Sequence, residues 1–202
     1  MIITSFEKSK KNKDMIKVFI DGEYSLTISE EDYLLLGLYE KKEVTQEELD
    51  LIKTNILMKD VRACAIKYLS LRLLSERELF EKLQLKGYDE EIINEVILDL
   101  KSIGYINDMI YARKFVYERL KLKPKSKKML KMELKNKGIA DEISDEVINN
   151  LEYDESVAIE RLVKKRFGKY NLEDPRIIRK IYSFLLHRGF DYENIKAILK
   201  SI

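Results

Sequence analysis

The sequence predicts a mainly α-helical protein, in which three tandem three-helix repeats form an elongated array behind a small N-terminal β-hairpin extension. Three observations predict this fold class. A basic residue followed by glycine recurs every 51 residues, and the apolar residues around each glycine recur with it at helical spacing. Near the N-terminus, an Asp-Gly pair between β-rich segments marks a hairpin.

Three segments carry the repeat: Lys86-Gly87-Tyr88, Lys137-Gly138-Ile139 and Arg188-Gly189-Phe190. Apolar residues recur eight and four positions before each glycine, and nine, ten and thirteen positions after it. Residues three and four apart share one face of a helix, so these offsets describe two packed helices. Glycine ends the first helix because the position after a helix often requires a positive φ. The final +13 position is Ile202, which corresponds to Leu100 and Leu151.

A third helix is expected before each pair, over about 61–73, 108–122 and 154–167. Ser75 with Glu78 reads as a capping box, and Asp108, Asp154 and Asp174 are expected N-caps. The expected domains are residues 1–60, with a β-hairpin and helices, followed by repeats at 61–107, 108–153 and 154–202.

The first sixty residues do not repeat. Asp21-Gly22 between β-rich flanks predicts a type I′ turn within 17–28, and residues 2–6 are a candidate third strand. Helices are expected over 29–37 and 45–58, each with a Ser or Thr N-cap. An isolated two- or three-stranded ribbon is barely stable, so it is expected to lean on helices.

Composition narrows the class of protein. Of the 202 residues, 45% are hydrophobic and 37% are charged, which suits amphipathic helices with a solvated surface. The single cysteine, Cys64, excludes an internal disulfide and is expected to be a structural thiol. The sequence has no secretory signal and no apolar run of about 18 residues, so we expect a cytoplasmic protein without a membrane partner.

The chemistry of an enzyme is missing from the sequence. His187 is the only histidine, which leaves no Ser-His-Asp or Cys-His arrangement with a spare ligand, and we expect it to have a capping or surface role. The glycines are isolated and form no phosphate-binding loop. We therefore expect no enzymatic activity, no catalytic residues, no metal, no cofactor and no small-molecule substrate.

Charge is segregated along the chain. Residues 112–138 contain eleven Lys or Arg against two Glu, whereas residues 140–155 contain seven acids and no base. An ordinary solvated helix face would mix the two signs, so the basic run favours a face that binds a polyanion or a protein. The candidate binding residues are Lys121, Lys123, Lys125, Lys127, Lys128, Lys131 and Lys135, with a second group at Arg161, Lys164, Lys165 and Arg166.

Several runs resemble the RecX family of regulatory proteins. They are residues 65–72 (AIKYLSLR), 75–79 (SEREL), 83–88 (LQLKGY) and 100–108 (LKSIGYIND), followed by Tyr111-Ala112. The resemblance covers about 61–202 and implies three three-helix repeats that bind RecA filaments on single-stranded DNA. It further implies hindered filament extension and lower recombinase and co-protease activities, with roles in DNA repair, homologous recombination and the SOS response. Single-stranded DNA would be bound weakly, or within the filament.

Two other interpretations remain open. The first is a helical protein that acts on DNA directly, and the second is a helical-repeat scaffold for an unrelated protein. Exposed aromatic residues on a basic face would favour single-strand binding by stacking, and Tyr117 and Tyr170 are the candidates.

The repeat pattern makes a prediction about shape. A helix of about 13 residues is only about 20 Å long, so three modules in line would give an elongated molecule. Small-angle scattering is expected to show a maximum dimension well above that of a sphere of equal mass. A compact spherical profile would contradict the array.

Overall fold

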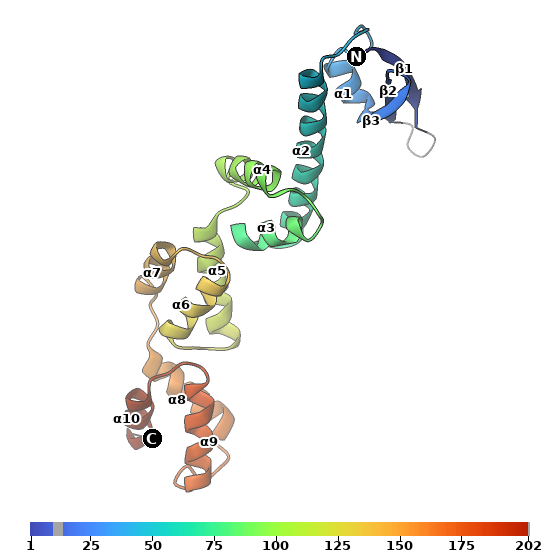
Figure 1. The fold of residues 1–202 in the computed structure, drawn as a ribbon. Helices are drawn as coiled ribbons and strands as arrows, with labels where there is room; N and C mark the ends of the chain where they lie inside the picture. The colour runs from blue at the N-terminus through green and yellow to red at the C-terminus, as the bar shows by residue number, and fades with distance from the viewer. Residues whose placement is uncertain (10–13, 202) are drawn as a thin grey trace. The chain divides into compact units, whose positions relative to one another are not determined.

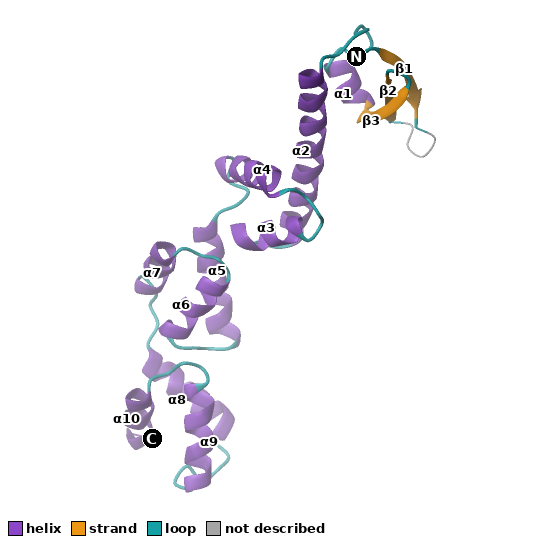
Figure 2. Ribbon diagram, viewed as in Figure 1, coloured by secondary structure: helices purple, strands orange, loops and turns teal. Residues whose placement is uncertain are grey.

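The computed structural model describes residues 1–9 and 14–201, which form three strands and ten helices (Figures 1 and 2). These residues divide into two compact units. One contains Met1–Ile66 with Tyr88–Val96, and the other contains Lys67–Gly87 with the residues from Ile97 onward. The predicted fold class, helical repeats behind a small β element, is confirmed.

The N-terminal sheet is antiparallel, in the order β1 (Ile3–Lys8), β2 (Met15–Ile20), β3 (Glu23–Ser29). Asp21 and Gly22 have φ values of +49° and +86°, as a type I′ turn requires, and the expected third strand is present as β1. Alternate side chains of β2 and β3 are buried. They pack with Leu38, Val44 and the first half of the following long helix, which is how the small sheet obtains a core.

Helix α1 (Glu30–Leu35) begins at Ser29, whose hydroxyl accepts a hydrogen bond from the Asp32 N–H. Helix α2 (Gln46–Leu71) begins after Thr45, which forms a capping box with Glu48. The expectation of two separate helices over 45–58 and 61–73 is wrong, because α2 is continuous for 26 residues. No glycine or proline stands near residue 60 to end it.

The remaining helices are α3 (Glu76–Gln84), α4 (Glu90–Ser102), α5 (Asp108–Leu122), α6 (Lys127–Asn136), α7 (Asp141–Asn149), α8 (Glu155–Phe167), α9 (Pro175–Leu186) and α10 (Tyr192–Ser201). Helices α5–α7 enclose one core and α8–α10 another. The apolar positions eight and four before the glycines are fully buried: Leu79, Leu83, Leu130, Leu134, Ile181 and Leu185. The predicted register is therefore confirmed there, whereas Ile202 lies outside the described residues.

Most expected caps are present: the Ser75–Glu78 capping box, Asp154 on α8 and Asp174 on α9 with Pro175 at the first helical position. The expectation for Asp108 is wrong. Asn107 caps α5, while the Asp108 carboxylate accepts a hydrogen bond of 2.9 Å from the backbone N–H of Glu76 on α3. Asp108 thus satisfies a free donor at the start of another helix.

That contact lies at a joint between two repeats. We define a joint as the place where the first turn of one helix contacts the glycine-containing turn of the next repeat, and we call that turn the glycine corner. In the first joint, the Ser75 hydroxyl donates to the carbonyl of Lys137 at 2.7 Å, and Lys137 Nζ lies 2.7 Å from a Glu78 carboxylate oxygen.

In the second joint, the Ser126 N–H donates to the carbonyl of Arg188 at 3.1 Å. Beside it, the Lys127 N–H donates to the Glu155 carboxylate at 2.7 Å. Ser126 lies 51 residues after Ser75, and Arg188 lies 51 residues after Lys137. The contact between successive modules therefore recurs at the same 51-residue spacing as the sequence pattern.

The corner glycines are required for two reasons. Gly138 and Gly189 have φ values of +78° and +83°, which disfavour any side chain. A Cβ on Gly138 would also lie 2.4 Å from Arg77 Cβ, and one on Gly189 would lie 2.8 Å from Met129 Cβ. At Gly87, with φ +89°, a Cβ would meet no described atom within 4 Å.

These differences predict unequal costs for the same substitution. Gly87→Ala is expected to lower the free energy of unfolding by about 1 kcal/mol through backbone strain alone. Gly138→Ala and Gly189→Ala should each cost about 1–3 kcal/mol more, because the joint has no room for the methyl group. Chemical denaturation of the three variants is the measurement, and equal losses would argue against tight joints.

The first joint should also be sensitive to acid. Burial works against the charged form of Glu78, but the Lys137 ammonium and neighbouring hydrogen bonds hold its pKa below the ordinary 4.5. Because the folded-state pKa is the lower one, this stabilisation is complete above pH 4.5 and is lost as the pH falls through the folded-state value.

Glu78→Gln should therefore lower the free energy of unfolding at pH 7 by about 1 kcal/mol, with the difference from the parent protein shrinking below pH 4.5. Glu81→Gln is the matched control, since among the described residues Glu81 forms an ion pair with Arg77 alone, and both side chains are exposed. Denaturation curves at several pH values measure both variants. A loss that does not vary with pH would exclude the ion pair as its cause.

Candidate polyanion-binding cleft at the second joint

The basic run is divided by the fold. Lys131 and Lys135 on α6 form ion pairs with Asp145 at 2.7 Å and Asp141 at 3.8 Å on α7. The hydrogen bond from Lys131 to Asp145 raises the pKa of the lysine. The sequence suggested that acids were nearly missing beside these lysines, and this is wrong, because the acidic segment folds back to supply them.

Two other lysines of the run are held by nearby groups. Lys125 forms an ion pair with Glu133. Lys127 donates its backbone N–H to Glu155 and places Nζ 3.4 Å from the carbonyl of Leu151. By contrast, Lys121, Lys123 and Lys128 form no ion pair with any residue in the described part of the chain.

A cleft opens at the second joint. It consists of two hollows of 620 and 400 Å³ that share Arg166, Phe184 and Arg188. We call the two together the joint cleft. Its basic lining residues are Lys121, Lys123, Lys125, Arg161, Lys165, Arg166, Lys180, His187 and Arg188. No Asp or Glu of the described residues lines either hollow, so the cleft is strongly electropositive.

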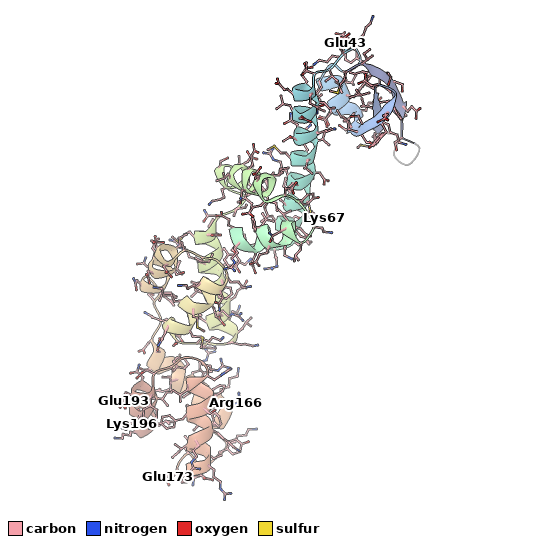
Figure 3. The ribbon with its side chains drawn as sticks, in the orientation of Figure 1. Glu43, Lys67, Arg166, Glu173, Glu193 and Lys196 are labelled. Atoms are coloured by element: carbon pink, nitrogen blue, oxygen red, sulfur yellow. The ribbon has the colours of Figure 1, made fainter. Side chains whose placement is uncertain are left out.

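Helix geometry brings these residues together from distant parts of the sequence. Pro124 ends α5 just after Lys121 and Lys123, which places both at the rim. Arg161 and Lys165 lie one turn apart on α8, whose opposite face buries residues of the α8–α10 core. Figure 3 shows Arg166 of α8 beside α9.

Two guanidinium groups lie over the ring of Phe184, which lines both hollows of the cleft. The guanidinium carbons of Arg166 and Arg188 lie 4.4 and 4.5 Å from the Phe184 ring centroid, within cation–π range. Arg188 also donates from Nη1 to the carbonyl of Pro124 at 3.0 Å. Burial, and then the nearby charge of Arg166, lower the pKa of Arg188. Two like charges are thus held close together without a carboxylate lining the cleft.

The structure gathers part of the predicted residue set. Lys121, Lys123, Lys125, Arg161, Lys165 and Arg166 line the joint cleft, whereas Lys127, Lys128, Lys131, Lys135 and Lys164 do not. Sequence reasoning missed Lys180, Phe184 and Arg188. The one available signal was the four-residue spacing of these three, which places them on one side of α9 and its C-terminal turn.

A second, more apolar groove of 930 Å³ adjoins the cleft and shares Lys121, Pro124 and Arg161 with it. Tyr117, a sequence candidate for base stacking, is exposed and lines this groove. Tyr170 is also exposed but lines neither the groove nor the cleft.

Within 1–9 and 14–201, no helix has the length and apolarity to cross a bilayer. The same residues contain no group of three or more His, Cys, Asp or Glu placed to hold a metal ion.

Three-helix modules linked by a recurring joint, behind a small sheet, define a helical-repeat protein. Residues 62–100, 107–148 and 153–199 match the first, second and third three-helix domains of RecX, and residues 1–45 match the N-terminal domain of regulatory protein RecX. The chain belongs to the RecX family of regulatory proteins.

Relatives match along nearly the whole chain. A regulatory protein RecX of Caldanaerobacter subterraneus subsp. tengcongensis is 34% identical and covers 98% of both chains. One of Clostridioides difficile is also 34% identical, over 100% of this chain and 95% of its own.

Two crystal structures share the fold. One, of regulatory protein RecX, has a TM-score of 0.73 at 21% identity over 98% of both chains. The other, RecX from Lactobacillus salivarius, has a TM-score of 0.62 at 28% identity over 73% of this chain and 97% of its own.

Proposed function

We propose that this protein is a non-catalytic, cytoplasmic regulator that binds RecA filaments on single-stranded DNA and inhibits the recombinase and co-protease activities of RecA. The joint cleft is the observation that carries this proposal, because a filament of protein and DNA presents a polyanion. Membership in a family of regulatory proteins named RecX supports RecA as the partner.

The cleft suits a partner that carries many negative charges. Its cations come from both the α5–α7 and the α8–α10 modules, so an extended anionic ligand could contact both at once. Lys121, Lys123, Lys165 and Arg161 form no ion pair with any described residue. Contact with a partner therefore does not require an internal ion pair to be broken first.

One experiment separates this proposal from its alternatives. The protein is incubated with RecA filaments on single-stranded DNA, with DNA alone and with free RecA, and each mixture is sedimented or captured. Preference for the filament is expected. Equal capture by bare DNA would favour a protein that acts on DNA directly, and no capture by any of the three would favour a scaffold for another partner.

Charge reversal tests which surface inhibits RecA. Lys121→Glu/Lys123→Glu/Lys165→Glu is expected to weaken filament binding and inhibition of RecA strand exchange by roughly ten- to a hundredfold, because at least two phosphate contacts become repulsive. The helical circular-dichroism spectrum should not change, since all three side chains are exposed.

The control is Lys114→Glu/Lys128→Glu/Lys164→Glu, which makes the same change of net charge at exposed positions outside the cleft. This variant should inhibit RecA almost normally. If both triple variants lose inhibition equally, general charge explains binding, and the cleft is not the binding surface.

A further inference from the structure

We infer that the joint cleft is a binding site for the phosphodiester backbone of a single nucleic-acid strand, and that an occupied cleft ties together the two modules that meet at the second joint. The inference rests on the proposed function for its polyanionic partner. It adds the chemical class of the ligand, the residues that bind it and the effect of binding on the second joint. All three can be measured without RecA.

The ligand class follows from the cations. Arg166 and Arg188 lie within 4.5 Å of the Phe184 centroid, and Lys123, Lys125 and Lys180 line the same hollow. Guanidinium groups suit phosphate oxygens because their planar N–H fork can donate two parallel hydrogen bonds. A bound phosphate would also screen the repulsion between Arg166 and Arg188, which now contributes to the lowered pKa of Arg188.

The aromatic ring argues against recognition of bases in the cleft. Single-strand proteins that read bases expose an aromatic face for stacking. Here guanidinium groups lie over Phe184, and Phe167 approaches it edge-on at 5.7 Å between centroids. Two guanidinium groups and a second ring thus compete with any base for the Phe184 ring, so the cleft should bind the backbone without regard to sequence.

The position of the cleft links binding to the joint. Lys121, Lys123 and Lys125 belong to the α5 end of the joint, whereas Arg166 and Arg188 belong to α8 and the α9 corner. Lys125 is paired with Glu133, but without an anion Lys121 and Lys123 repel Arg166 and Arg188 across the joint. A phosphate chain that contacts both sides replaces that repulsion with attraction, so binding and joint closure stabilise each other.

The direct test uses the full chain and fluorescent oligonucleotides without RecA. Binding of a thymidine 20-mer is measured by anisotropy at several salt concentrations, next to an abasic strand of equal length. The two strands are expected to bind within about threefold of each other. Much tighter binding of the thymidine strand would overturn the backbone-only assignment, and tighter binding of polyglutamate than of either strand would show that the site takes acidic protein segments.

Arg166→Gln/Lys180→Gln is the test variant, because neither side chain takes part in the joint hydrogen bonds. Removing two phosphate contacts should make the log–log salt slope shallower by about 1.4, at about 0.7 per contact, and weaken binding about tenfold or more. Lys131→Gln/Lys135→Gln removes the same charge from lysines paired with acids and should leave the slope almost unchanged. Equal slopes in the two variants would remove the cleft as the site.

Amide hydrogen exchange reports on the joint itself. The Ser126 N–H, which donates to the Arg188 carbonyl, should exchange at least several-fold more slowly when the thymidine strand is bound. The Glu76 N–H, bonded to Asp108 in the first joint, provides an internal control and should not change. Unchanged exchange at Ser126 with the strand bound would refute the coupling. Strand binding without inhibition of RecA would instead refute the proposed function and leave this site intact.

Discussion

The contact between a glycine corner and the first turn of another helix organises the second unit. Next to Gly138, the carbonyl of Lys137 accepts a hydrogen bond from the buried Ser75. Next to Gly189, the carbonyl of Arg188 accepts one from the buried Ser126. A Cβ atom on either glycine would clash with the facing helix. The contact satisfies helix-end donors and acceptors that would otherwise be buried without partners. Because it joins one module to the next at the same point each time, the geometry of every surface that spans two modules depends on it.

The two joints share a geometry but differ in charge. The first contains Glu78, whose carboxylate neutralises Lys137. In the second, Met129 occupies the position equivalent to Glu78, and Arg188 turns instead to Phe184 and the Pro124 carbonyl. The first joint has a carboxylate that the second joint lacks. An ion pair at the first joint therefore corresponds to an open electropositive cleft at the second. A repeated fold can in this way have an electropositive cleft at one junction and a closed ion pair at the other.

Neutralisation within the fold decides which basic residues are available to a partner. Helix α7 pairs its acids with α6, so the densest lysine run in the sequence is partly neutralised. Lys121 and Lys123 at the end of α5, and Arg161 and Lys165 on α8, form no ion pair with any described residue. Local charge density along the chain is consequently a poor guide to the potential at the surface, which depends on the helices that pack nearby.

The sequence by itself determined the helical repeats, the hairpin, the positive-φ glycines and most caps, because each depends on residues close together in the chain. The residues from Leu79 to Leu185 that fill the repeat register were predictable for the same reason. Only the tertiary structure decided that Asp108 bonds to the first turn of α3 and that Lys131 is paired with Asp145. It also brought Lys180, Phe184 and Arg188 to Lys123, since the sign and strength of an electrostatic site depend on distances between segments far apart in sequence.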